Sequence, residues 1–161
     1  MTTTENITSF FQKDHHRLDG LFQQFRALKQ SDPAKAKELF LQFRDGLLRH
    51  IRWEEDLLFP VFESKTGLHG SGPTAVMRFE HEQIQKALSR ISEQMELGGS
   101  GLDDAEQMLI AVLVEHNMKE EVMLYPTMDE IVSDEEREGI FRKMDLMTGH
   151  EGGGHCCEQH P

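Results

Sequence analysis

One arrangement of histidines and glutamates occurs twice in this 161-residue chain, 66 positions apart, and this repeat limits the possible folds more than any other feature. The sequence His-Ile-Arg-Trp-Glu-Glu-Asp-Leu-Leu-Phe-Pro at 50–60 recurs as His-Asn-Met-Lys-Glu-Glu-Val-Met-Leu-Tyr-Pro at 116–126. His15 recurs at the same offset as His81. Because each half holds the same pattern, we expect two copies of one structural unit related by an approximate two-fold axis.

Each half contains two segments in which apolar residues recur with the period of an α-helix. Ile7, Phe11 and Leu18 share one face of the first segment, and no long segment alternates apolar and polar residues as a strand does. Stretches rich in glycine, proline and serine separate the segments. The pattern predicts an all-α fold, an antiparallel up-down four-helix bundle, because only mutual packing buries all four apolar stripes. The long segments cover residues 5–29, 33–64, 74–97 and 103–132, and a short extra C-terminal helix is expected at 134–147.

Two pairs of residues have the spacing of a capping box, in which a Ser or Asp and a Glu three residues later bond each other's backbone N–H groups. They are Asp103 with Glu106, and Ser133 with Glu136. We therefore expect a helix to begin at each of these places.

Polar side chains interrupt the four apolar stripes at a single level of the bundle. His15 lies 16 residues before the turn near residue 31 and His50 lies 19 residues after it, which at about 1.5 Å per residue agrees to within one helical turn. Burying an unpaired carboxylate costs several kcal/mol, and a buried imidazole needs partners for both nitrogens. These groups must therefore be satisfied together. The inward polar residues, which we call the polar layer, are His15, His50, Glu54, His81, His116 and Glu120.

The chemistry of the polar layer predicts a site for two metal ions. A histidine and a glutamate four residues apart share one helix face, and bundle cores hold two metals with inward residues from all four helices. Nitrogen and oxygen donors without thiolate suit iron or manganese, and zinc less well when carboxylates can bridge. We expect two iron ions, with manganese or zinc as the alternatives. We expect two histidines per ion with Glu54 and Glu120 as bridges, and an oxo or hydroxo bridge and a small molecule in the remaining positions. Glu55 and Glu121 project about 100° around the helix from the predicted ligands Glu54 and Glu120. There they are either solvated or hydrogen-bonded to the ligands.

The combination of motifs resembles the hemerythrin-like, or HHE cation-binding, family over about residues 5–132. This resemblance implies a bundle of hemerythrin type with a non-haem di-iron site that binds dioxygen or a related diatomic molecule. The matching motifs are Asp14-His15-His16-Arg17-Leu18, His50-x-x-x-Glu54-Glu55, Glu80-His81 and His116-x-x-x-Glu120-Glu121.

Two positions depart from the oxygen-carrying hemerythrins. Met77 stands where those proteins have a further histidine, and Glu120 follows His116 by four residues where they have an aspartate after five. The set of four histidines and two glutamates is similar to that of bacterial di-iron proteins connected with nitrosative stress and iron–sulfur repair.

The charge of the chain excludes some partners. Asp and Glu outnumber Lys and Arg by 29 to 17, a net charge of −12, which argues against nucleic acid and anionic membranes as partners. No apolar run approaches the 18 residues of a membrane span, and the first residues lack the features of a secretory signal. We therefore expect a cytoplasmic protein.

The sequence divides into a di-metal domain at 1–148, with its core at about 5–132, and a glycine-spaced tail at 149–161. The tail could bind a soft metal or act as a redox handle, or it could be a flexible terminus without fixed structure. Its metal-binding side chains are His150, His155, Cys156, Cys157 and His160.

The favoured function is that of a non-haem di-iron protein that binds dioxygen or a related diatomic, such as nitric oxide or peroxide, for sensing, scavenging or storage. A redox partner protein is a further possible partner. Binding needs only the open positions that the ligand count implies. One alternative is a di-iron redox enzyme that acts in oxidative or nitrosative stress or in iron–sulfur cluster repair. Another is a module for iron storage or delivery.

Overall fold

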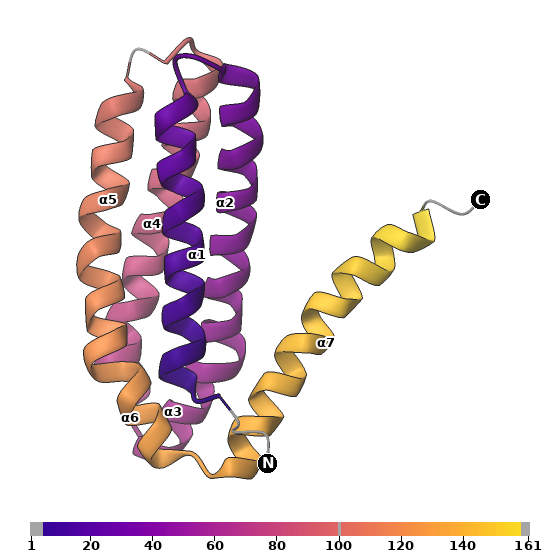
Figure 1. Cartoon of the computed structure of the whole chain (residues 1–161). Coiled ribbons are helices and arrows are strands. Elements are labelled where there is room, and N and C mark those ends of the chain that lie inside the picture. The colour runs from indigo at the N-terminus through magenta and orange to yellow at the C-terminus, as the bar shows by residue number, and fades with distance from the viewer. Residues whose placement is uncertain (1–4, 100, 159–161) are drawn as a thin grey trace.

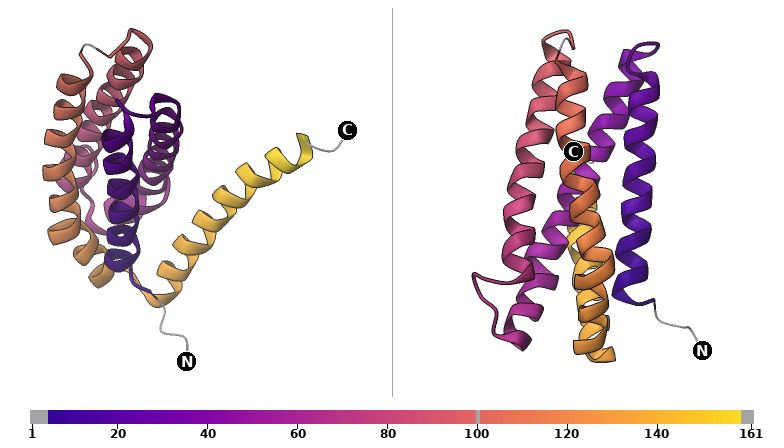
Figure 2. Two further views of the ribbon diagram at one scale, coloured as in Figure 1. Left: turned by 45° about the horizontal axis from the view of Figure 1, so that its top comes forward. Right: turned by 90° about the vertical axis from the view of Figure 1, so that its left-hand side faces the viewer.

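The computed structural model describes residues 5–99 and 101–158, and the side chains among them up to residue 148. Every regular element in these residues is helical, which confirms the predicted all-α bundle. The four longest bundle helices, α1, α2, α4 and α5, run side by side as two hairpins (Figures 1 and 2). The elements are α1 (Ile7–Leu28), α2 (Pro33–Trp53), η1 (Glu54–Leu58), α3 (Phe59–Thr66), α4 (Pro73–Glu96), α5 (Leu102–Lys119), η2 (Glu120–Leu124), α6 (Tyr125–Ile131) and α7 (Asp134–Glu158).

Local side-chain caps start three of these helices. The Asn6 side chain accepts a hydrogen bond from the Ser9 N–H, and Asp32 caps α2 ahead of a proline in its first turn. The predicted capping box of Ser133 and Glu136 is confirmed, because each side chain bonds the other residue's N–H, at 2.8 and 3.1 Å. These caps satisfy N–H groups that have no partner inside the helix.

The second predicted capping box, of Asp103 and Glu106, is wrong. Helix α5 begins at Leu102, and Glu106 is fully buried and does not reach back to the helix start. Its carboxylate accepts hydrogen bonds from Arg26 and Lys29 of α1, both at 2.8 Å. Two cations on the neighbouring helix attract the carboxylate more strongly than one backbone N–H does.

The apolar core consists of two clusters, one on each side of the polar layer. One cluster lies toward the α1–α2 and α4–α5 turns and includes Phe22 and Phe43. The other lies toward α3, α6 and α7 and includes Phe11 and Phe59. The polar layer therefore lies between two bodies of packed side chains that exclude water from it.

A π-helical segment follows α2 in the first hairpin and α5 in the second, and each begins at a glutamate of the polar layer. The N–H of Phe59 bonds the carbonyl of Glu54, and the N–H of Tyr125 bonds the carbonyl of Glu120, five residues earlier. Such segments are rare and occur often at functional sites. Residues five apart diverge on an ordinary α-helix, so the wider turn is what brings Tyr125 over Glu120.

Helix α7 is longer than the segment 134–147 that the sequence indicated, since it continues to Glu158. Only its beginning packs on the bundle, through the buried side chains of Ile140 and Met144, and the rest diverges from the bundle (Figures 1 and 2). The side chains from residue 149 onward, including the predicted metal-binding groups of the tail, lie outside the described residues. Among the residues described, no helix is long and apolar enough to cross a membrane.

Gly46 lets α1 and α2 approach each other closely, and a larger residue there is expected to destabilise the fold. A Cβ atom at this position would lie 2.8 Å from Leu18 Cδ2 and 3.2 Å from Arg17 Nη2. We expect Gly46→Val to lower the free energy of unfolding by about 1–3 kcal/mol, measured by urea denaturation. Gly20→Val is the matched control, because a Cβ there meets nothing within 4 Å. Equal stability of the two variants would contradict the prediction.

Candidate metal centre

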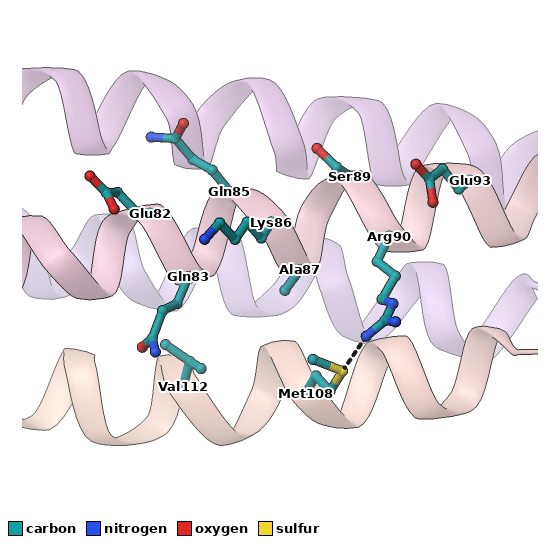
Figure 3. Close-up of a pocket in the computed structure, with 10 residues that line it drawn as sticks. All are labelled: Glu82, Gln83, Gln85, Lys86, Ala87, Ser89, Arg90, Glu93, Met108 and Val112. Atoms are coloured by element: carbon teal, nitrogen blue, oxygen red, sulfur yellow. Dashed lines mark hydrogen bonds between the residues drawn. The ribbon is translucent and has the colours of Figure 1, made fainter.

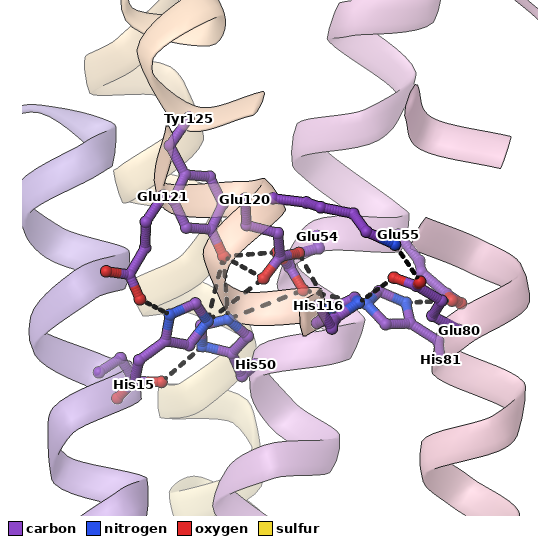
Figure 4. A network of polar contacts seen from close by, with 12 residues as sticks. His15, His50, Glu54, Glu55, Glu80, His81, His116, Glu120, Glu121 and Tyr125 are labelled. Carbon is purple, nitrogen blue, oxygen red and sulfur yellow. Dashed lines mark hydrogen bonds and ion pairs between the residues drawn. The ribbon is translucent and has the colours of Figure 1, made fainter. Parts of the chain in front are cut away.

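The polar layer lies inside the bundle, with side chains from both hairpins directed toward one another (Figure 4). Each of its six residues is at most 3% exposed. The rings of His15 and His50 lie 4.7 Å apart between centroids, and those of His81 and His116 lie 4.9 Å apart. The structure thus brings together all six residues that the sequence predicted, with the histidines paired within each hairpin.

The two glutamates lie between the histidine pairs. Glu120 has one oxygen 3.2 Å from His15 Nε2 and the other 3.2 Å from His116 Nε2, so it spans both pairs. Glu54 Oε1 lies 3.2 Å from His81 Nε2. Donor atoms close enough to share one ion form two groups, and Glu120 belongs to both. The groups are Glu54, His81, His116 and Glu120, and His15, His50 and Glu120.

Three buried atoms of the polar layer make no well-aligned hydrogen bond, although each has an oppositely charged or polar neighbour at 3.2 Å. They are Glu54 Oε1, His81 Nε2 and Glu120 Oε2. Leaving a buried polar atom unpaired costs about 1–3 kcal/mol, and folded proteins keep few of them. A bound cation would accept a lone pair from each atom. The residues present therefore fit a metal centre, and imidazole nitrogen with carboxylate oxygen suits iron or manganese.

Every histidine of the polar layer has a carboxylate against its Nδ1, on the side away from the centre. Such a carboxylate fixes the tautomer and aims Nε2 inward. We call these four groups the outer carboxylates. The pairs are His15 with Glu121 (2.8 Å), His50 with Asp14 (2.8 Å), His81 with Glu55 (2.7 Å) and His116 with Glu80 (3.0 Å).

Sequence reasoning recognised only half of the outer carboxylates. It left Glu55 and Glu121 as either solvated or supporting groups, and the structure places both in the supporting role. It assigned no role to Asp14 and Glu80. A signal was present, because these two acidic residues are also 66 positions apart and each precedes a histidine of the polar layer.

Loss of an outer carboxylate is expected to weaken metal binding. We expect Asp14→Asn to lower the affinity of the His15 and His50 side by about 10–100-fold, because His50 loses the charge that holds its tautomer and orientation. Competition with a chelator of known affinity measures the change. Asp45→Asn on the exposed face of α2 is the control. Equal affinities of the two variants would show that Asp14 does not support the ligand.

Tyr125 makes the two halves of the centre unequal, and sequence reasoning missed this. Its buried hydroxyl lies 2.7 Å from Glu54 Oε2 and 2.9 Å from Glu120 Oε1. The corresponding residue of the first half is Phe59, which instead stacks on His81 with 5.6 Å between ring centroids. The signal was a difference between the repeats, Phe-Pro in one and Tyr-Pro in the other.

Charges within the layer shift the pKa values of the metal-free protein. Burial alone would lower the pKa of His15, but hydrogen bonding and attraction from Glu120 outweigh it and raise the pKa to about 9. At His81, burial again acts to lower the pKa, but the neighbouring carboxylates of Glu54 and Glu55 outweigh it and raise the pKa to about 10. Both imidazoles are therefore protonated at neutral pH, and a metal must displace these protons.

The metal-free protein is expected to lose stability as the pH rises above neutrality. The pKa values of His15 and His81 are raised above the ordinary 6.5, so their contribution is fully present below pH 6.5. It is lost as the pH rises through about 9 and 10, because the folded state then gives up protons that had stabilised it. Urea midpoints measured in the presence of a chelator should fall across this range. A constant or rising midpoint would contradict the assignment.

The surface grooves do not coincide with the polar layer. A groove of about 800 Å³ lies between α4 and α5, where Arg90 contacts the sulfur of Met108 (Figure 3). None of the six predicted ligands lines it.

A helical bundle with a buried layer of paired histidines and bridging carboxylates defines a class of candidate dinuclear metal proteins. Within that class, the chain belongs to the hemerythrin family. The family model described as the hemerythrin HHE cation binding domain matches residues 6–145.

Three curated relatives match significantly. A DNA nickase of Nostoc sp. is 26% identical over 133 residues, which are 83% of this chain and 36% of the relative. The iron-sulfur cluster repair protein DnrN of Neisseria gonorrhoeae is 38% identical over 61 residues, 38% of this chain and 39% of the relative. An uncharacterized hemerythrin-like protein of Schizosaccharomyces pombe is 28% identical over 124 residues, 77% of this chain and 60% of the relative.

These relatives are all longer than the part that matches. The aligned regions cover between 36% and 60% of their lengths. No solved structure gives a significant match to the chain.

Proposed function

We propose that this chain is a non-haem di-iron protein that binds a diatomic molecule, dioxygen or nitric oxide, for sensing, scavenging or storage. The buried layer, in which two histidine pairs face two carboxylates and three inward atoms make no well-aligned hydrogen bond, carries the proposal. The iron ligands in this proposal are His15, His50, Glu54, His81, His116 and Glu120.

The ligand count leaves room for a small molecule. With Glu120 shared, the two groups of donor atoms give one ion four protein donors and the other ion three. Two iron ions, when bound, would supply open coordination positions and a change of oxidation state. The apolar clusters on both sides of the layer exclude water, and this environment favours an uncharged diatomic over a hydrated anion.

Residues around the centre would orient its ligands and hold a proton beside it. The outer carboxylates hold the imidazoles with Nε2 inward and add negative charge beside the cations. Burial, followed by the charges of Glu120 and Glu54, raises the pKa of Tyr125 well above its ordinary value. The phenol therefore keeps its proton and remains a hydrogen-bond donor beside the centre.

Iron–sulfur cluster repair or another redox reaction is a second candidate. It is supported by the similarity to the iron-sulfur cluster repair protein of Neisseria gonorrhoeae. That similarity covers only 38% of this chain, so we rank cluster repair below diatomic binding as the proposed function. Steady consumption of nitric oxide or peroxide with a reductant would favour the enzyme, and a stable adduct without turnover would favour binding.

Metal analysis combined with optical spectroscopy tests the proposed function. We expect two iron ions per chain after anaerobic loading, and absorption of a bridged ferric pair after exposure to air. Reduction followed by dioxygen or nitric oxide should change the spectrum in a ligand-specific way. The proposal would be rejected if the protein held no iron after the loading procedure, or if neither gas changed its absorption spectrum.

A further inference from the structure

We propose that Tyr125 and Trp53 form a one-electron path between the metal centre and the surface of α2. The proposal rests on the proposed function, because it requires a redox-active centre at the polar layer. These residues are the only tyrosine and the only tryptophan of the chain. Their side chains are the aromatic groups that lose a single electron most readily, and the fold places both on the same side of the centre.

The inner end of the path is the Tyr125 hydroxyl. It lies 3.2 Å from His50 Nε2 and 3.4 Å from His15 Nε2, next to the donors of one predicted ion. The residue is completely buried. An electron can therefore pass between this phenol and the centre without crossing solvent.

Phe11 connects the two oxidisable rings. Its ring centroid lies 5.0 Å from that of Tyr125 and 6.3 Å from that of Trp53, and the residue is fully buried. A continuous aromatic contact thus runs from the polar layer through α1 to the end of α2. Phe10 contacts Trp53 at 5.9 Å and Phe11 at 5.4 Å between ring centroids, so it lies beside the path and reaches Tyr125 only through Phe11.

The outer end of the path is cationic. Trp53 is 6% exposed, and the Arg49 guanidinium lies over its ring at 5.0 Å. Arg49 lines a groove of about 530 Å³ together with Arg17, Arg52 and Asp45, and Arg17 is ion-paired with Asp14 at 2.9 Å, so three arginines face two aspartates here. In a chain whose net charge is −12, this local excess of arginine favours an anionic electron donor.

The second half of the repeat lacks the path. Phe59 replaces Tyr125, Lys119 replaces Trp53, and Met77 replaces Phe11 at the 66-residue offset. The ligands themselves are the same in both halves. The aromatic connection is therefore present on only one side of the centre, although the six predicted ligands are repeated on both sides.

The transfer balances as follows for one electron. A ferric pair is too weak an oxidant for a phenol, so the step would begin from a centre oxidised further by peroxide. Tyr125 would then give one electron to that centre, and its phenolic proton would pass to Glu54 Oε2, 2.7 Å away. Trp53 then gives an electron to the tyrosyl radical, and the proton returns from Glu54. An anionic one-electron donor, such as ascorbate, finally reduces Trp53 and is itself oxidised by one electron.

Zinc-loaded protein tests the pair without iron chemistry, because zinc has no redox change. Azide radicals made by pulse radiolysis oxidise tryptophan in preference to tyrosine. We expect tryptophanyl absorption to decay while tyrosyl absorption grows at the same first-order rate, independent of protein concentration. Here the electron passes from Tyr125 to the Trp53 radical, which is the reverse of the step above through the same contacts. Absence of the tyrosyl signal, or a rate that rises with concentration, would overturn the proposal.

Two variants test the connection through Phe11. Phe11→Leu should slow the transfer severalfold, because the aromatic bridge is lost. Phe22→Leu, a buried phenylalanine of the other apolar cluster, is the matched control and should leave the rate unchanged. Zinc content and helix content verify that both variants fold. An unchanged rate in folded Phe11→Leu would reject Phe11 as the bridge and with it the path.

Iron-loaded protein tests whether the pair serves the centre. In iron-loaded protein treated with peroxide, the decay of the tyrosyl absorption in the presence of ascorbate should be severalfold slower in Trp53→Phe, and added salt should slow it in the wild type. Equal rates in the two proteins would overturn the assignment. Failure of the chain to bind iron would reject the proposed function alone, since the zinc experiment judges the Tyr125–Trp53 pair independently.

Discussion

Replacing Glu120 with glutamine is expected to remove both metal ions, whereas the same change at Glu54 should leave one. Glu120 belongs to both groups of donor atoms, and each of its oxygens faces a histidine of a different pair. Glu54 belongs only to the group of His81 and His116, and its nearer oxygen lies 3.7 Å from His50 Nε2. The affinity loss in Glu120→Gln should exceed the about 100-fold that marks the upper range for outer carboxylates.

Metal content after dialysis against a weak chelator measures this difference. Glu115→Gln is the control, because Glu115 lies on α5, directly before η2, and is exposed. It should bind the same amount of metal as the wild type. Retention of two ions by Glu120→Gln, or loss of both by Glu54→Gln, would contradict the bridging arrangement in which Glu120 serves both sites.

Removal of the metal is expected to lower the melting temperature by about 8–16 °C. A ligand present at about 1,000 times its Kd stabilises the folded state by about 4 kcal/mol. For a chain of this length, each kcal/mol corresponds to about 2–4 °C. Without the cations, the inward atoms of Glu54, His81 and Glu120 make no well-aligned hydrogen bond inside the core.

Calorimetry with and without a strong chelator measures the shift. The Glu120→Gln variant is the control, since a protein that no longer binds metal should melt at the same temperature in both conditions. If the chelator did not change the melting temperature of the wild type, the polar layer would be stable as a network without metal. That outcome would also count against the proposed function.

Much of the fold could be predicted because helical periodicity and the cost of burying polar groups act locally. The spacing of Phe11, His15 and Leu18 places a histidine on an apolar face, and no packing detail is needed to see that it is buried. The repeat then brings four such helices into one layer. The four-helix bundle and the meeting of the six polar residues both followed from these local rules.

Other features depended on contacts between distant segments. Glu106 has the spacing of a capping residue, but the cations of Arg26 and Lys29 on a neighbouring helix draw it inward. The length of α7 could not be read from periodicity, because only Ile140 and Met144 near its start are buried against the bundle. The two π-helical segments also escaped prediction, since a sequence pattern does not distinguish a five-residue from a four-residue hydrogen bond.

The sequence by itself determined that four amphipathic helices form two similar hairpins and bury four imidazoles and two carboxylates at one level. These facts follow from spacing along single helices. Only the tertiary structure decided which carboxylate stands behind each histidine and that Glu120 spans both pairs. It also decided that the Tyr125 hydroxyl reaches Glu120 in one half while Phe59 stacks on His81 in the other. The physical reason is that these contacts join different helices, whose rotation and depth are fixed by packing and by the local π-helical turns.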